Sequence, residues 1–261
     1  MKTLSILGIG NSFSMDTTHF LAEAALGCGI EQVNIANLYI GGCSIEMHAD
    51  NARKDAPAYE LYENDGSGWV ITPKHKISDA LKKRTWDHVF IQHGSKNGSR
   101  YTLERCYDRL PELARYVRAT ASGSPVISFN MTWSDTECST RPEPVFYNHD
   151  QVYFMKRLFA VTKAQVLPAP YIDKVVPTGT AIQNLRAGTG LDLSRDGVHM
   201  DKSLGRYAAA VGFLHGLCGI DISNISWAPD GVTPVQKRAV IKAALAASAN
   251  PYEITPVGFE A

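Results

Sequence analysis

A serine stands near the start of the chain in a setting suited to nucleophilic catalysis. It is Ser12, within the run Gly8–Ser14, which follows a short apolar segment where a strand is expected to end and a helix to begin. Ligands of open α/β sheets bind beyond the carboxyl ends of the strands, so the Ser12 hydroxyl would face such a crevice. The free N–H groups of the helix start would suit a developing oxyanion. The alternative is that Ser12 or Ser14 only caps the helix.

An acid and a base for such a serine occur together in the last third of the chain. Asp196 and His199 are separated by two residues, one of them Gly197, and precede a predicted helix over residues 202–217. This spacing lets the carboxylate turn back onto Nδ1 of the imidazole and leaves Nε2 for a serine hydroxyl. Without an upstream serine, the same residues would read as an ordinary loop before a helix. Together with Ser12 they predict a catalytic triad.

Donors for an oxyanion follow the next two predicted strands. The pair Gly41–Gly42 permits a positive φ and a close approach of a backbone N–H, although glycine pairs also occur in plain turns. Gln92 and Asn97 supply side-chain amides after the third strand. Three successive strand ends therefore each offer a group suited to acyl transfer.

The elements that must position these groups alternate between strand and helix patterns. Apolar runs indicate strands at residues 3–9, 32–40, 87–92, 125–130 and 164–167. Helical spacing of apolar residues indicates helices at 15–26, 77–83, 103–118 and 150–162, with Pro111 bending or restarting the third. This alternation predicts a three-layer α/β/α sandwich with a mostly parallel sheet of about five strands.

Two segments depart from the alternation. Residues 59–72 carry Asn, Asp and Gly between aromatic and β-branched flanks, which predicts a hairpin inserted beside the sheet at the rim of a site. Thr233–Gln236 is a capping box with Pro at the first helical position, and it predicts a C-terminal helix over 234–247. The sequence contains neither repeats nor linker-like stretches, so we expect residues 1–261 to form a single domain.

Charge and composition disfavour several classes of function. Of the 261 residues, 44% are hydrophobic, and 26 Lys and Arg balance 26 Asp and Glu. A chain without a basic excess has no field to attract phosphate backbones or anionic lipid, so nucleic-acid and membrane-surface roles are disfavoured. The apolar runs are also shorter than the roughly 20 residues of a membrane span.

The cysteines and the N-terminus bear on location. The five cysteines are scattered and form no C-x-x-C pair, which predicts free thiols, a reducing compartment and no structural zinc. The first apolar run is shorter than the roughly 7–15 residues of a secretory signal. We expect a cytoplasmic protein from the sequence as it stands, and a periplasmic or secreted one if a leader has been removed.

These motifs, taken in order, resemble the SGNH, or GDSL-type, hydrolase superfamily. The resemblance extends from Gly8 to about Gly219 and rests on the runs Gly8–Ser14, Gly41–Ser44 and Asp196–His199. They are similar in particular to a poorly characterised branch, a domain of unknown function found beside bacterial polysaccharide-degrading enzymes.

The resemblance implies a flavodoxin-like arrangement of the sheet and a role for each matching residue. Ser12 matches the nucleophile, and its N–H and that of Gly42 match oxyanion donors. Asp196 and His199 match the acid and the base of the last block.

Two positions depart from the pattern of that superfamily. Asn11 stands where the Gly-Asp-Ser motif has Asp, a neutral replacement that keeps the turn geometry. The third block should read Gly-x-Asn-Asp, whereas residues Gly94–Asn97 carry the Asn one position late and without a following Asp. A Gln at this strand end is found in sialate-acetylesterase-like branches, so the resemblance implies Gln92 as the side-chain oxyanion donor.

The expected activity is hydrolysis of short-chain esters by a serine mechanism that uses no metal and no organic cofactor. Aromatic residues near the predicted strand ends suit the faces of sugar rings, and they are Tyr39, Tyr59, Trp69, Tyr101 and Trp133. No long apolar lid is visible for a fatty acyl chain. We therefore expect an esterase that removes O-acetyl groups from a carbohydrate, with Asn11, Trp133 and Asn97 contacting the substrate.

Other functions fit the same motifs. A non-catalytic member of the fold that only binds glycans would account for the altered third block. A lipase, a thioesterase or an acyltransferase would use the same triad with another acyl chain or another acceptor. The sequence makes no prediction of the oligomeric state.

Overall fold

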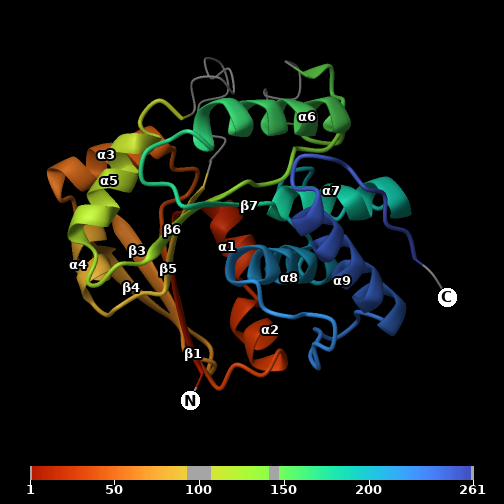
Figure 1. Cartoon of the computed structure of the whole chain (residues 1–261), viewed down its shortest axis with the longest axis horizontal. Coiled ribbons are helices and arrows are strands. Elements are labelled where there is room, and N and C mark those ends of the chain that lie inside the picture. The colour runs from red at the N-terminus through yellow and green to blue at the C-terminus, as the bar shows by residue number, and fades with distance from the viewer. Residues whose placement is uncertain (1, 93–106, 141–146, 260–261) are drawn as a thin grey trace.

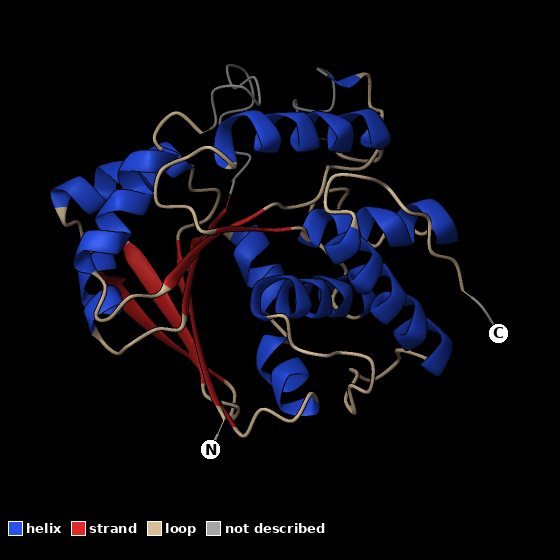
Figure 2. Cartoon of the chain, in the orientation of Figure 1, coloured by secondary structure: helices blue, strands red, loops and turns tan. Residues whose placement is uncertain are grey.

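The protein is a seven-stranded sheet with helices on both faces. The computed structural model describes residues 2–92, 107–140 and 147–259. Figure 2 shows the sheet nearly edge-on between its helical layers, and the strand order across it is β4-β3-β2-β1-β5-β6-β7. The predicted α/β/α sandwich is confirmed, and the two strands beyond the expected number belong to the hairpin.

Five parallel strands form the main part of the sheet. They are β1 (Thr3–Gly10), β2 (Gln32–Tyr39), β5 (His88–Gln92), β6 (Val126–Asn130) and β7 (Lys174–Val176). Every residue of β1 after Thr3 is buried, as expected of a strand covered on both faces. β1 pairs with β2 on one side and β5 on the other, so the chain changes direction across the sheet beside β1. Ligands of such sheets bind beyond the carboxyl ends at this switch point.

An antiparallel hairpin completes one edge of the sheet. It consists of β3 (Tyr59–Asn64) and β4 (Trp69–His75), and β3 pairs with β2. The Asn64 side-chain oxygen accepts hydrogen bonds from the N–H groups of Gly66 and Gly68, two glycines at positive φ, and so closes the turn. The structure therefore has the predicted hairpin, as part of the sheet itself.

Two helical layers cover the sheet (Figure 1). One contains α1 (Ser12–Thr18), α2 (Leu21–Gly27), α7 (Thr178–Thr189), α8 (Leu204–Cys218) and α9 (Pro234–Ala249). The other contains α3 (Ile45–Lys54), α4 (Ile77–Lys82), α5 (Leu110–Thr120) and α6 (Gln151–Val161). Each layer buries its own apolar cluster against the sheet.

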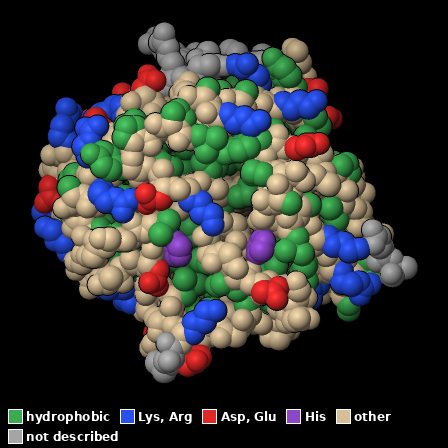
Figure 3. Space-filling model, viewed as in Figure 1, with side chains coloured by type: hydrophobic (Ala, Val, Ile, Leu, Met, Phe, Trp, Pro, Cys, Tyr) green, Lys and Arg blue, Asp and Glu red, His purple; other side chains and the backbone are tan. Residues whose placement is uncertain are grey.

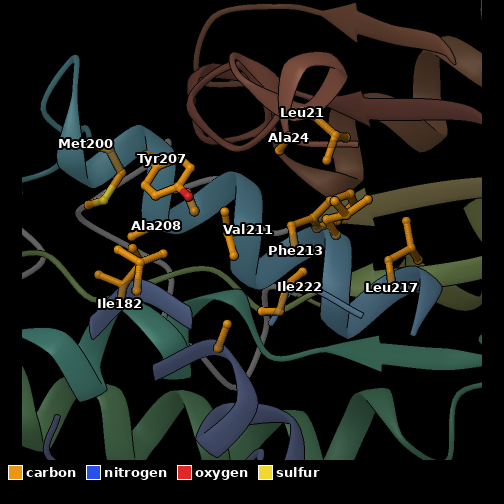
Figure 4. Packing of buried hydrophobic residues seen from close by; sticks show 14 of the residues in the cluster. Leu21, Ala24, Ile182, Met200, Tyr207, Ala208, Val211, Phe213, Leu217 and Ile222 are labelled. Atoms are coloured by element: carbon orange, nitrogen blue, oxygen red, sulfur yellow. The ribbon is translucent and has the colours of Figure 1, made fainter. Parts of the chain in front are cut away.

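Helix α8 is the centre of the first layer. It is apolar nearly all round, as expected of a helix packed on every side. The Phe213 ring meets Phe90 of the sheet edge-on at a centroid distance of 4.7 Å. Figure 4 shows Phe213 beside Val211, Leu217 and Ile222 in this cluster. The core of this layer is therefore built around one helix that follows the His199 loop directly.

The strand predicted at residues 164–167 is wrong. Thr162–Val166 continue α6 as a π-helical turn, and the Leu167 N–H donates to the carbonyl of Thr162. The fifth parallel strand is β7, which spans three residues and is too short to show a period. A short apolar run fits a helix end as well as a strand.

Several helix boundaries also differ from the prediction. The helix expected at 15–26 is divided into α1 and α2 by a break at His19 and Phe20. Helix α5 has Pro111 in its first turn, so this proline starts the helix, and residues 103–106 lie outside the described residues. Helix α9 opens on the predicted capping box and runs to Ala249. The sequence patterns did not predict α3 and α7.

Surface and composition features agree with a chain of balanced charge. Lys and Arg alternate with Asp and Glu over the face drawn in Figure 3. Among the described helices, none is both long and apolar enough to cross a membrane. Cys28, Cys43, Cys138 and Cys218 are not joined in disulfides. In the described ranges, no three His, Cys, Asp or Glu side chains are grouped as a metal site would require.

We expect Phe213→Ala to destabilise the protein by about 3–5 kcal/mol, because it leaves a cavity beside the Phe90 ring in a fully buried layer. Leu245→Ala on α9, where the side chain is 37% exposed, should change stability by no more than about 0.5 kcal/mol. Denaturant unfolding measures both values. Equal effects of the two substitutions would contradict the assignment of Phe213 to the core.

Candidate active site

Three side chains from opposite ends of the sequence form one chain of hydrogen bonds. Ser12 Oγ lies 2.9 Å from Nε2 of His199, and Nδ1 of the same ring lies 2.6 Å from Oδ2 of Asp196. A carboxylate only accepts hydrogen bonds, so Nδ1 carries the ring proton and Nε2 accepts from the serine hydroxyl. The structure thus brings together the three residues predicted as a triad, with the geometry that a serine nucleophile and its base require.

The side chain of Asn11, and not that of Ser12, caps the helix that follows β1, which leaves the Ser12 hydroxyl for the bond to His199. Asn11 is the N-cap of α1, and its side-chain oxygen accepts from the Phe13 N–H at 3.0 Å. Ser14 donates to the Asn11 carbonyl and to the side-chain oxygen of Asn37. The capping alternative for Ser12 therefore does not hold, because its neighbours satisfy the local backbone.

The His199 loop is shaped by its own short contacts. The Asp196 Oδ1 atom accepts from the N–H groups of Val198 and His199, which turns the carboxylate onto the imidazole. Gly197 has φ 78°, and a Cβ at this position would lie 2.5 Å from the backbone nitrogen of Ser139. Only glycine fits this turn, so the two-residue gap between acid and base depends on Gly197.

A buried carboxylate on α1 holds this loop against the serine. The Asp16 side chain is 1% exposed and lies 3.1 Å from Arg195 Nη1 and 2.8 Å from Arg206 Nε. It also accepts from the Met200 N–H at 2.9 Å. Asp16 stands one helical turn after Ser12, so the same helix carries the nucleophile and the anchor of its base.

The acid of the triad is held in its ionised form by its hydrogen bonds. Partial burial alone would raise the pKa of Asp196, but the bonds from the His199 ring and from the His199 and Val198 backbone outweigh it and lower this pKa. An ionised Asp196 can orient the ring and stabilise an imidazolium, the role this residue needs in a triad.

Two backbone N–H groups beside Ser12 are suited to an oxyanion. The N–H groups of Ser12 and of Gly42 have no hydrogen-bond acceptor among the residues that the structure describes. Gly42 adopts φ 62° in the turn after β2, and this turn is joined to the Ser12 turn by the bond from the Asn11 side-chain amide to the Cys43 carbonyl. The side chain of a single asparagine therefore joins the turns that carry the two donors.

Gln92 contacts Asn11, the residue that precedes Ser12. Its side chain is fully buried at the end of β5, and Nε2 donates to the Asn11 side-chain oxygen at 2.9 Å. The amide braces the Asn11 turn. Its role as a side-chain oxyanion donor stays a prediction. Asn97 lies outside the described residues.

The other two residues predicted to contact substrate, Asn11 and Trp133, are used inside the protein. Asn11 is 1% exposed, and its amide makes the three bonds described above. Trp133 is 2% exposed and donates from Nε1 to the Val198 carbonyl at 2.7 Å, with its ring against Phe13. These contacts show that both residues hold the site together. The sequence alone could not show that their polar atoms have partners inside the protein.

The aromatic residues expected near the strand ends divide into two groups. Tyr59 is buried, and its hydroxyl lies 2.8 Å from Nδ1 of the buried His48, whose pKa is lowered to about 3 by burial. Tyr39 and Trp69 are half-buried on the sheet face that carries α1. Tyr101 lies outside the described residues.

Two further charged residues support the site and were not predicted. Arg206 pairs with Asp16, as described above. Arg186 on α7 has a fully buried side chain that donates to the carbonyls of Asp192 and Ser134, next to the His199 loop. Burial lowers the pKa of Arg186 to about 10, against the opposing charge of Asp192. A charged residue within a helical segment that is otherwise apolar is the sequence signal that could have identified these residues.

Comparison with known proteins identifies relatives over nearly the whole chain. Residues 5–248 match the family described as "Domain of unknown function (DUF4886)". The crystal structure of a DUF4886 family protein from Bacteroides uniformis is similar, with 32% identity, a TM-score of 0.88, and coverage of 97% of this chain and 98% of that one. A search of curated proteins finds no match.

We expect Asp16→Asn to destabilise the protein by about 3 kcal/mol, because it removes the charge that compensates two guanidinium groups. Displacement of the His199 loop should also lower kcat for any reaction that uses Ser12 and His199 by about tenfold or more, with a smaller change in KM. Denaturant unfolding and steady-state kinetics measure these effects.

The matched control is Asp55→Asn, which changes an exposed carboxylate that pairs with Lys76 on the opposite helical layer. This control should leave stability and kcat close to those of the wild type. An Asp16→Asn protein of wild-type stability and activity would show that the His199 loop does not depend on this carboxylate.

Proposed function

The chain belongs to the DUF4886 family, a domain of unknown function, and from the geometry of its site we propose that it is a serine esterase of the SGNH type. Its proposed substrate is a short-chain, O-acetyl ester of a carbohydrate. The observation that carries this proposal is the hydrogen-bonded chain from Ser12 through His199 to Asp196. The described residues hold one other nucleophile beside a base, Cys43 Sγ at 3.4 Å from His48 Nδ1, but both of these side chains are fully buried and closed to a substrate.

In the acylation step, Ser12 Oγ attacks the ester carbonyl carbon while His199 Nε2 takes the hydroxyl proton. The tetrahedral intermediate then collapses, the bond to the leaving alcohol breaks, and His199 gives its proton to the departing oxygen. Ser12 is left as an acyl ester. Asp196 stays ionised throughout and stabilises the imidazolium that forms between the two transfers.

In the deacylation step, water takes the place of the alcohol. His199 removes a proton from the water as it attacks the acyl-enzyme carbonyl, and then returns that proton to Ser12 Oγ as the acid departs. In each half of the reaction the carbonyl oxygen gains negative charge beside the N–H groups of Ser12 and Gly42. Such preorganised donors are each worth about 10²–10³ in rate.

The position of the site in the sheet supports an SGNH-type assignment. Ser12 follows β1 and Gly42 follows β2, and the parallel strands run in the order second, first, third, fourth and fifth along the chain. This order is that of flavodoxin-like sheets, whose ligands lie at the switch point beside the first strand. The Asp196 and His199 pair enters the same place from the loop before α8.

We expect Ser12→Ala and His199→Ala each to lower kcat/KM for p-nitrophenyl acetate by a factor of about 10³ or more. The double variant should lose little beyond either single one, because the two side chains act as a unit. Ser223→Ala, in an exposed loop, is the matched control and should keep full activity.

If the fold-loss in kcat/KM of the double variant equals the product of the two single losses, His199 is not the base for Ser12. A folded wild-type protein without activity on any ester would instead favour a protein that binds glycans and does not hydrolyse them.

We expect kcat/KM to fall from acetyl to octanoyl p-nitrophenyl esters by about tenfold or more, which needs about 1.4 kcal/mol of differential transition-state binding. A closed acyl site gains strain from each added methylene, whereas an open apolar groove gains about 0.8 kcal/mol per buried CH₂. The rate of Ser12→Ala on each ester is the background to subtract. A profile that rises with chain length would place the protein among lipases or thioesterases.

A further inference from the structure

The exposed side of α1 begins at the nucleophile. Ser12, Met15 and His19 are the partly exposed residues at this helix, and the others from Phe13 to Thr18 are buried. Positions three and four apart share a face of a helix, so these three side chains form one strip, here called the α1 strip. Burial, with a contribution from Arg206, lowers the pKa of His19 to about 4, so the strip is uncharged at neutral pH.

Aromatic rings accompany the α1 strip. Tyr39 at the end of β2 meets Tyr62 at a centroid distance of 5.6 Å, and Tyr62 meets Trp69 at 6.4 Å. Trp69 Nε1 donates to the carbonyl of His19 at 3.4 Å. The row therefore passes from the hairpin to α1, and each of these rings is half-buried, with part of it open to solvent.

The row continues beyond α1 to a cavity. His19 meets Phe20 at a centroid distance of 4.6 Å, and Phe20 meets Trp227 at 5.4 Å. Phe20 and Trp227 are two walls of a cavity of about 360 Å³, and its other lining residues are Lys202, Ser203, Ala228, Pro229 and Asp230. A cavity of this size is within the range that small organic ligands occupy.

Two chain segments join this cavity to the triad. Phe20 comes eight residues after Ser12, which corresponds to about 12 Å along a helical path. Lys202 comes three residues after His199, the side chain that contacts Ser12. A separation of about 12 Å along the helix exceeds one sugar ring and suits one extended molecule.

We infer that this cavity is a distal subsite that binds a sugar unit of a glycan chain whose ester lies at Ser12. The inference rests on the proposed esterase function and extends it, because it makes an oligosaccharide or polysaccharide the substrate, and not a monosaccharide or a free acyl ester. The chain of the substrate would follow the α1 strip between the two positions.

The chemistry of the lining favours a sugar over an acyl chain. A pyranose has an apolar face that packs on aromatic rings and a rim of hydroxyls that both donate and accept hydrogen bonds. Phe20 and Trp227 supply the rings, and Ser203 and the exposed Lys202 and Asp230 supply donors and acceptors of both signs. A fatty acyl chain in the same cavity would strip water from a cation and a carboxylate without replacing it.

The first test measures binding without catalysis. Titration calorimetry of Ser12→Ala with unacetylated xylo-, manno- and chito-oligosaccharides, from the disaccharide to the hexasaccharide, should show affinity that rises with length for at least one series. Adding Trp227→Ala, or Lys202→Ala together with Asp230→Ala, should weaken binding of the longest member by about tenfold or more. The substitutions at the exposed Lys202 and Asp230 should leave the protein folded even if Trp227→Ala does not. Thermal unfolding checks the folding of each variant.

Matched controls lie on other parts of the molecule. Tyr171→Ala removes an exposed aromatic ring before β7, at the amino-terminal edge of the sheet. Lys82→Ala with Asp79→Ala removes one exposed cation and one exposed carboxylate of α4 in the other helical layer. Both should bind the oligosaccharides like Ser12→Ala alone.

The second test separates this inference from the proposed function. In the catalytically active protein, the cavity variants should raise KM for chemically acetylated oligosaccharides of the series that binds by about tenfold, and leave kcat/KM for p-nitrophenyl acetate unchanged.

Hydrolysis of p-nitrophenyl acetate without length-dependent oligosaccharide binding would overturn the subsite and leave the esterase in place. Binding lost in the cavity variants, in a protein that hydrolyses no ester, would overturn the esterase and leave the sugar site. Equal binding by cavity variants and controls would overturn the subsite.

Discussion

The ion pairs of Asp16 are the interaction on which the rest of the site depends. The triad joins residues 187 positions apart in sequence, and nothing local to either partner brings them together. Asp16 does so by pairing with Arg195 and Arg206 and by accepting from the Met200 N–H, on both sides of His199. A carboxylate this deeply buried is costly unless its partners are fixed, so the same bonds that satisfy it also fix the loop.

The sheet supplies the other half of the geometry. The backbones of β1 and β2 run in register to Gly10 and Tyr39, so the two turns that follow them begin side by side. The Ile40 N–H donates to the Gly10 carbonyl, which carries the pairing into the turns. Ser12 and Gly42 are then held by paired backbone, and the buried Asn11 side chain joins the two turns.

Features of the site that depend on short stretches of sequence could be predicted, and those that depend on tertiary contacts could not. The Asp196 and His199 pair, the serine after β1 and the capping box at Thr233 are all set by residues within about four positions of one another. The role of Asp16 depends on arginines 179 and 190 positions away. Trp133 resembles a loop aromatic in sequence, and only the fold shows that its N–H is used by Val198.

The residues Asn11 and Gln92 explain one another. Asn11 accepts from Gln92 Nε2 and from the Phe13 N–H, and its own amide donates to the Cys43 carbonyl. An aspartate could accept the first two bonds, but its second oxygen would face the Cys43 carbonyl, where two acceptors repel.

The asparagine amide therefore needs an acceptor in the Gly42 turn, which is the Cys43 carbonyl. The asparagine oxygen accepts a further hydrogen bond from Gln92 at the end of β5. Gln92 thereby braces the turn that carries Ser12. The amide at the end of β5 thus positions Asn11, and Asn11 in turn positions Ser12.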